Sequence, residues 1–126
     1  VVRLTTGEFA LLSIGKAGII VVSLDRNEND LYNPLFFVKL SKYIEGYDIV
    51  HVHLFPCQYW VVLAAVFTCS EVRLVTTEHN TDNRRRNKEA SSRWIKMIYK
   101  RYDAIIAISD KTSSRLSGYF GSKDRV

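Results

Sequence analysis

Four short, mainly apolar runs rich in β-branched residues alternate with longer segments of helical character in this chain. The runs cover 19–24, 48–53, 72–77 and 103–108. Such runs are typical of strands that are buried on both faces of a sheet and joined through helices. Because strand–helix–strand units have right-handed crossovers, the pattern predicts an α/β fold, a Rossmann-like doubly wound parallel sheet with helices on both faces.

Helix start and stop signals fall between these runs. Pro34 is suited to begin a helix and Gly46 to end it, and Ser109 with Asp110 can cap another. Helices are therefore expected at about 6–16, 34–46, 57–69, 90–101 and 109–121.

The bulk composition indicates one domain. The chain has 126 residues, of which 47% are hydrophobic and 25% are charged, as in an ordinary soluble domain. It does not begin with Met, and its last residues read as the start of another strand. We therefore expect it to be part of a longer protein.

Two cysteines and one apolar stretch indicate in which cellular compartment the protein is located. A helix would hold Cys57 and Cys69 about 18 Å apart, too far for a disulfide. Free, buried thiols suit a reducing compartment, so a cytoplasmic location is expected. The apolar stretch from Tyr59 to Cys69 is far shorter than the roughly 20 residues that span a bilayer.

Positive charge is concentrated in the second half of the chain. Residues 1–71 hold 5 basic and 7 acidic side chains, whereas residues 72–126 hold 13 and 6. Between Arg84 and Arg101 there are eight basic residues and one acid, Glu89. An anionic partner is therefore expected.

The helix within this basic segment has two interpretations. Its apolar residues Trp94, Ile95, Ile98 and Tyr102 form one stripe. We favour a stripe that faces the core, with the basic residues in solvent. The alternative is a contact with anionic lipid headgroups or a phosphate-bearing acceptor, in which the protein would sit peripherally on the inner face of the membrane. The residues assigned to that contact are Arg84, Arg85, Arg86, Lys88, Arg93 and Trp94.

Polar side chains follow three of the predicted strands. In an open parallel sheet, ligands bind outside the carboxyl ends of the strands. The residues at those ends are His51, His53, Glu78, His79, Asn80, Ser109 and Asp110. This edge is the predicted site.

His79 is the strongest candidate among them, because an imidazole at a strand end can donate to a sugar hydroxyl or a phosphate, or exchange a proton. His51 and His53 share one face of their strand. Both can equally be structural, hydrogen-bonded histidines. Ser109 is more readily a helix N-cap than a nucleophile. Three imidazoles can bind zinc, but the spacing here is weak evidence, and no metal is assigned.

Three segments in order resemble the amino-terminal domain of GT-B fold glycosyltransferases of family 4. They are Tyr-Asp-Ile-Val-His-Val-His-Leu-Phe-Pro at 47–56, Thr-Thr-Glu-His-Asn at 76–80 and Tyr-Asp-Ala-Ile-Ile-Ala-Ile-Ser at 102–109. The resemblance covers nearly the whole chain. It departs from the family in lacking the opening strand with its glycine-rich loop.

The resemblance implies an activity and a division of labour. Family members move a sugar from a nucleotide-sugar donor to an acceptor with retention of configuration, using two Rossmann-like domains that face each other across a cleft. Residues 1–126 would be the single acceptor-side domain of an enzyme of polysaccharide biosynthesis acting on a glycan or lipid-linked acceptor. The donor domain with its paired glutamates is absent from this sequence, so the chain alone is not expected to catalyse transfer.

The resemblance also assigns site residues. His79 corresponds to the family histidine beside the transferred sugar and is the predicted catalytic residue. The predicted substrate-binding residues are His53, Glu78, Asn80 and Ser109. The donor is a substrate, and no cofactor is expected.

Two alternatives differ in function. A GT-B sugar-nucleotide epimerase has the same architecture and needs no separate acceptor. The sequence pI near 9.3 and the arginines at 84–86 would also suit a nucleic-acid-binding module. We disfavour nucleic acid as a partner because the strands lack interleaved basic and aromatic residues.

Overall fold

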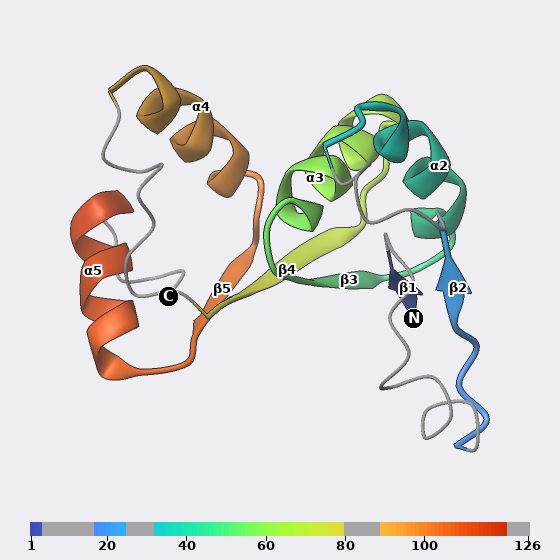
Figure 1. Ribbon diagram of the computed structural model, residues 1–126, viewed down its shortest axis with the longest axis horizontal. Coiled ribbons are helices and arrows are strands. Elements are labelled where there is room, and N and C mark those ends of the chain that lie inside the picture. The colour runs from blue at the N-terminus through green and yellow to red at the C-terminus, as the bar shows by residue number, and fades with distance from the viewer. Residues whose placement is uncertain (4–16, 25–31, 80–88, 121–126) are drawn as a thin grey trace.

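Figure 1 shows the computed structural model of the chain, in which residues 1–3, 17–24, 32–79 and 89–120 are described. The predicted helix at 6–16 lies outside these residues. So do Asn80, the arginines at 84–86 and Lys88, whose predicted contacts therefore stay predictions.

Strands and helices alternate along the described chain. In order, the elements are β1 (Val2–Arg3), β2 (Val22–Ser23), α2 (Leu35–Ile44), β3 (Ile49–His53), α3 (Cys57–Phe67), β4 (Arg73–Glu78), α4 (Glu89–Tyr99), β5 (Ala104–Ala107) and α5 (Asp110–Phe120). The predicted strand at 19–24 is reduced to the two residues of β2, which pair with β1 in parallel. The three later strands and the helices around them lie within two residues of their predicted bounds.

The main sheet has the strand order β3-β4-β5, and both neighbouring pairs are parallel. His53 pairs with Thr77, and Thr77 pairs with Ile106. Because the strands are parallel, their carboxyl ends meet at a single edge. The α/β class and the Rossmann-like parallel sheet predicted from the sequence are confirmed.

The hydrophobic core lies between this sheet and its helices. Helices α2 and α3 pack side by side next to β3, whereas α4 and α5 flank β5 (Figure 1). Phe36, Tyr102 and Leu116 are fully buried, and Leu74 and Ile105 supply the strand side of the core. At roughly 1.5–3 kcal/mol for each large apolar side chain, this burial is the main term holding the layers together.

The position of each cysteine relative to α3 accounts for how exposed it is. The apolar stretch forms a helix as predicted, but the helix ends at Phe67, so Cys69 lies beyond it in a turn. Both cysteines are free, as expected. The expectation that both are buried is wrong for Cys69, which is exposed because it lies past the helix end, whereas Cys57 is half-buried.

Two further expectations about burial differ from the structure. Trp94 was placed on the core stripe of its helix, but 67% of its surface is exposed, whereas Ile95 and Ile98 are buried. Trp94 lies at the border of the stripe, where a small rotation of the helix decides which side it faces. Helices were expected on both faces of the sheet, yet the face that carries Ile49 and Ile106 is largely exposed in the described part of the chain.

Candidate functional site

The carboxyl edge of the main sheet gathers the predicted site residues that the structure describes. His53 is the last residue of β3, His79 follows β4, and Ser109 lies between β5 and α5. All three side chains are exposed. The parallel strand order therefore brings to one edge residues that are as many as 56 positions apart in the sequence.

Three imidazoles form a row on one face of the sheet near that edge. The ring centroids of His51 and His53 are 4.3 Å apart, and those of His53 and His79 are 5.8 Å apart. Nδ1 of His53 lies 3.5 Å from Nε2 of His79. We call His51, His53 and His79 the histidine row. Alternate residues of a strand share a face, which explains the first pair, and strand register explains the second.

His51 is fixed by a neighbour that the sequence reasoning did not identify. Its Nε2 lies 2.8 Å from Oγ1 of Thr77, which is buried. This contact holds one ring nitrogen of His51 within the sheet. This hydrogen bond is consistent with a structural, hydrogen-bonded role for His51.

His53 occupies the centre of the row and its electrostatics reflect that place. The limited desolvation of this largely exposed imidazole lowers the pKa of His53 below its ordinary value, and the positive charges of protonated His51 and His79 lower it further. His53 is therefore mainly neutral at neutral pH. A neutral imidazole carries one donor and one acceptor nitrogen.

Glu78 lies on the other face of β4 from the histidine row. Its carboxylate is 4% exposed and accepts a hydrogen bond from the Tyr99 hydroxyl of α4. It was expected beyond the strand as a substrate-binding residue, but β4 extends through Glu78, and strand alternation turns this side chain toward the helices. Direct substrate contact by Glu78 stays a prediction.

A buried polar network surrounds Glu78, and its centre is Gln58 of α3. Gln58 Nε2 donates to Oγ1 of Thr76 at 2.9 Å, and Gln58 Oε1 lies 3.0 Å from the Tyr99 hydroxyl. The Tyr102 hydroxyl donates to the Gln58 carbonyl oxygen at 2.7 Å. The sequence reasoning missed these residues, although a single glutamine in an otherwise apolar helix was a usable signal, because a buried amide requires partners.

Ser109 caps α5, as predicted. Its Oγ accepts a hydrogen bond from the backbone N–H of Thr112 at 3.3 Å and lies 3.0 Å from Oγ1 of the same residue. The chain forms a shallow hollow around this helix start, lined by residues 105–110 and Ser113. Ser109 thus borders an accessible space at the same edge as the histidine row.

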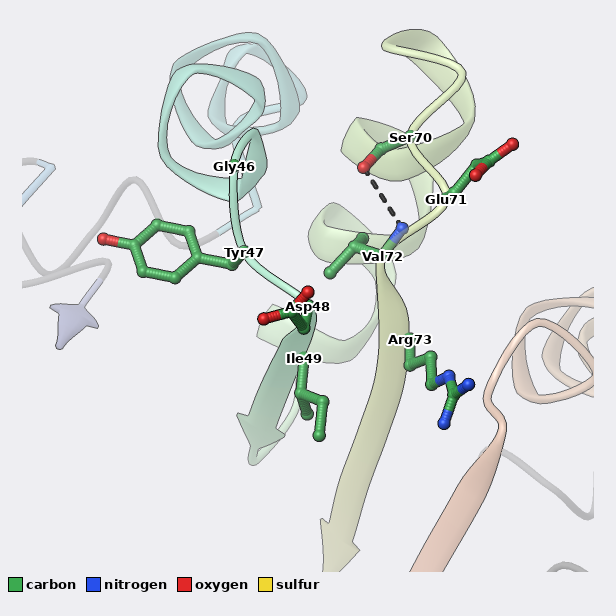
Figure 2. Close-up of a pocket in the computed structure, with 8 residues that line it drawn as sticks. All are labelled: Gly46, Tyr47, Asp48, Ile49, Ser70, Glu71, Val72 and Arg73. Atoms are coloured by element: carbon green, nitrogen blue, oxygen red, sulfur yellow. Dashed lines mark hydrogen bonds between the residues drawn. The ribbon is translucent and has the colours of Figure 1, made fainter.

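Another hollow lies at the opposite, amino edge of the sheet. Figure 2 shows its lining, which comes from residues 46–49 before and at the start of β3 and residues 70–73 at the start of β4. Ser70 Oγ accepts from the backbone N–H of Val72 at 3.3 Å. The predicted site residues lie instead at the carboxyl edge, where ligands of open parallel sheets bind.

The exposed side of α4 is basic. Arg93 and Lys96 are exposed on it together with Trp94 and Met97, and Lys100 is exposed directly after the helix. No acidic side chain lies between Arg93 and Arg101. This surface combines positive charge with two large apolar side chains.

A metal-binding cluster and a membrane-spanning helix are both absent from the described residues. No three His, Cys, Asp or Glu side chains there are grouped so that they could hold a metal ion. No helix among those residues is both long and apolar enough to cross a bilayer.

Comparison with known proteins identifies the family of the chain. The model of one family, described as Glycosyltransferase Family 4, matches residues 7–126. No curated protein and no solved structure gave a significant match. The family match spans almost all of the chain, including the three strands whose ends carry the histidine row and Ser109. The chain belongs to Glycosyltransferase Family 4.

Proposed function

We propose that this chain is the acceptor-side half of a retaining, GT-B fold glycosyltransferase that moves a sugar from a nucleotide-sugar donor to a glycan or lipid-linked acceptor. Family membership supports transferase activity of the full-length protein. The single observation that carries the site assignment is the gathering of His53, His79 and Ser109 at one edge of a parallel sheet.

His79 is the proposed catalytic residue. It is exposed at the carboxyl edge, where its imidazole can donate a hydrogen bond to the transferred sugar or to the departing diphosphate. Donors fixed in such a place stabilise the charge that develops as the nucleotide diphosphate leaves. In this proposal His53, Asn80 and Ser109 shape the space around the reacting sugar, and substrate contact by Glu78 stays a prediction.

The test is His79→Ala in the full-length enzyme. We expect kcat/KM to fall about 100-fold or more, because removing one such donor costs roughly 2.7–4 kcal/mol of transition-state stabilisation. Thermal unfolding should change little, since His79 is exposed. His51→Gln is the matched control, because glutamine can keep the contact with Thr77, and its turnover at about pH 8 should stay within about twofold. Turnover of His79→Ala at the wild-type rate would remove the catalytic role.

The exposed basic side of α4 is proposed as a peripheral contact with anionic membrane on the cytoplasmic side, where a lipid-linked acceptor is accessible. Its cations attract anionic headgroups, and Trp94 and Met97 can enter the interface. Vesicles containing phosphatidylglycerol should bind the protein, with binding lost at high salt and weakened by Trp94→Ala. Equal binding to neutral vesicles would contradict this contact.

A nucleotide-sugar epimerase is separated from a transferase by its products. Incubation of the full-length enzyme with a nucleotide sugar and no acceptor would yield an isomeric nucleotide sugar from an epimerase. A transferase would require an acceptor before the nucleotide diphosphate is released in quantity.

A further inference from the structure

Three aromatic rings meet where the chain leaves β3 at the carboxyl edge of the sheet. The ring centroids of Phe55 and Tyr59 are 4.9 Å apart in an edge-to-face arrangement, and those of Tyr32 and Phe55 are 5.8 Å apart. Tyr32 precedes α2, whereas Phe55 and Tyr59 lie just before α3 and in its first turn. We call Tyr32, Phe55 and Tyr59 the aromatic cluster. It is built from two connections that each lead from a strand into the following helix.

The members of the cluster differ in how exposed they are. Phe55 and Tyr59 are half-buried, and Tyr59 packs against the hydrophobic core. Tyr32 is the most exposed of the three, with 60% of its surface accessible. Its contact with a half-buried ring anchors Tyr32, while much of its own ring surface stays open to a ligand. An exposed group of aromatic side chains at a ligand-binding edge marks an interaction site.

The backbone on either side holds the cluster in place. Asn33 Oδ1 accepts a hydrogen bond from the backbone N–H of Leu35 at 2.9 Å, which anchors the entry into α2. Leu54, between His53 and Phe55, has a φ of 64°, a left-handed conformation that leucine rarely adopts. Such a conformation persists only where the surrounding structure supports it. The cluster is therefore a fixed surface that does not have to be ordered when a ligand binds.

The aromatic cluster lies close enough to the histidine row to share a ligand with it. Two residues of chain span at most about 7 Å, so the Cα atoms of His53 and Phe55 lie within that distance. His79, the proposed catalytic residue, lies against His53, with 3.5 Å between Nε2 of His79 and Nδ1 of His53. A disaccharide can span from the cluster to the histidines. One sugar ring can thus lie on the cluster while the next reaches His79.

The charge around the cluster indicates what kind of ligand it suits. Residues 32–38 and 54–70, which carry the three rings, include no Lys, Arg, His, Asp or Glu. Anionic lipid headgroups and phosphate groups are bound by cationic side chains, and Arg93 and Lys96 supply these on α4 instead. The tyrosines add hydroxyl groups to the apolar rings. A neutral ligand that presents both apolar and hydroxyl surface fits this composition.

We propose that the aromatic cluster is a carbohydrate-binding subsite, in which a neutral pyranose ring of the acceptor lies against Tyr32. The proposal rests on the proposed function and deepens it, because it names the chemical group that the acceptor brings to this edge. The C–H groups on one face of a pyranose carry slight positive charge and pack on the negative face of an aromatic ring. The hydroxyl groups at the rim of the sugar then bond to His53 and to the phenol groups of the cluster.

The experiment is saturation-transfer NMR on the full-length protein, in which saturation of the aromatic protons passes to the protons of a bound ligand. The probes are the methyl pyranosides of glucose, galactose, mannose and N-acetylglucosamine. Sorbitol offers hydroxyl groups without a ring, and hexanol offers an apolar chain in place of a sugar. We expect transfer to the ring C–H protons of at least one pyranoside, and none to sorbitol.

Tyr32→Ala is the decisive variant, because the substituted side chain is exposed and thermal unfolding should change little. Its affinity for that pyranoside should fall about fivefold or more, since an aromatic contact is lost. Any sugar site elsewhere in the full-length protein is unchanged, so the difference from wild type reports on the cluster alone. Tyr32→Phe keeps the ring and should bind within about twofold of wild type.

Tyr47→Ala is the matched control. Tyr47 is 65% exposed, close to the value for Tyr32, but it lies at the amino edge of the sheet (Figure 2). Its removal should leave pyranoside binding unchanged. Absence of transfer to every pyranoside, or equal affinity of wild type and Tyr32→Ala, would overturn the subsite. Tighter binding of hexanol than of every pyranoside, lost in Tyr32→Ala, would assign the cluster to an apolar chain and would overturn it too.

The readout also separates this inference from the proposed function, because ligand binding is measured without turnover. Failure of the pyranosides to bind, in an enzyme that loses activity in His79→Ala, would overturn the carbohydrate subsite alone. Wild-type turnover in His79→Ala, together with pyranoside binding that depends on Tyr32, would instead overturn the catalytic assignment alone.

Discussion

The two faces of the sheet at β4 both carry polar side chains, but those on one face are buried and those on the other are exposed. On the face toward the helices, Thr76 and Glu78 are buried, and each has a hydrogen-bond partner. On the other face His53 and His79 are exposed, and within the described part of the chain the polar contact between their two rings is a long one of 3.5 Å. Glu78 and His79 are consecutive in the sequence, and the alternation of side chains along an extended chain places them on opposite faces.

This difference separates stability from function. Buried polar groups that satisfy one another hold β4 against α3 and α4, and losing one partner leaves another unsatisfied in a dry environment. Exposed groups whose charges oppose each other contribute little to folding and can bind a ligand. Substitutions on the buried face should therefore change stability, and substitutions on the exposed face should change binding and pH dependence.

The largest effect on folding is expected at the centre of the buried network. Gln58→Leu removes the donor to Thr76 and a partner of Tyr99, and we expect unfolding to require about 2–4 kcal/mol less free energy. Urea denaturation measures this directly. His53→Asn on the opposite face should stay within about 0.5 kcal/mol of wild type. Equal losses at the two positions would abolish the distinction between the faces.

A smaller effect is expected at the helix that borders the site. Ser109→Ala removes the side-chain acceptor of the Thr112 N–H and should cost about 1 kcal/mol. Ser109→Asp restores an N-cap acceptor and should recover most of that stability in the same denaturation assay. A loss of turnover in Ser109→Asp without a loss of stability would show that this hydroxyl also binds substrate.

The smallest effect concerns the pKa of His53 in the free protein. His51 lowers it through the charge that His51 acquires on protonation, so His51→Gln should raise it. The sign follows because removing a neighbouring positive charge makes protonation of His53 easier. NMR titration measures the shift, and a pKa that falls in this variant would contradict the electrostatic description of the row.

Some features of the fold followed directly from residue patterns. The apolar runs at 48–53, 72–77 and 103–108 each gave a strand, because such segments gain most from burial in a sheet. Ser109 gave the predicted cap of α5, since that interaction is complete within four residues. The strand at 19–24 was predicted too long, because its apolar residues Ile19 and Ile20 are exposed and only Val22 and Ser23 find a partner strand.

Other features depended on positions that pattern alone does not settle. β4 ends at Glu78, one residue later than predicted. Glu78 is therefore buried as part of the strand, and His79 is the first exposed residue after it. A small rotation of α4 decided that Trp94 is exposed while Ile95 is buried. The partners of Gln58 come from β4, from α4 and from the residues after α4, so no local rule could identify them.

The sequence alone determined that this chain forms parallel strands linked by helices, and that polar side chains follow the strands at one edge, because hydrophobic periodicity and capping act over a few residues. Only the tertiary structure decided which of those side chains meet. The contact between His53 and His79 requires β3 and β4 to pair in one register, and that register is set by packing of the whole sheet against α3 and α4.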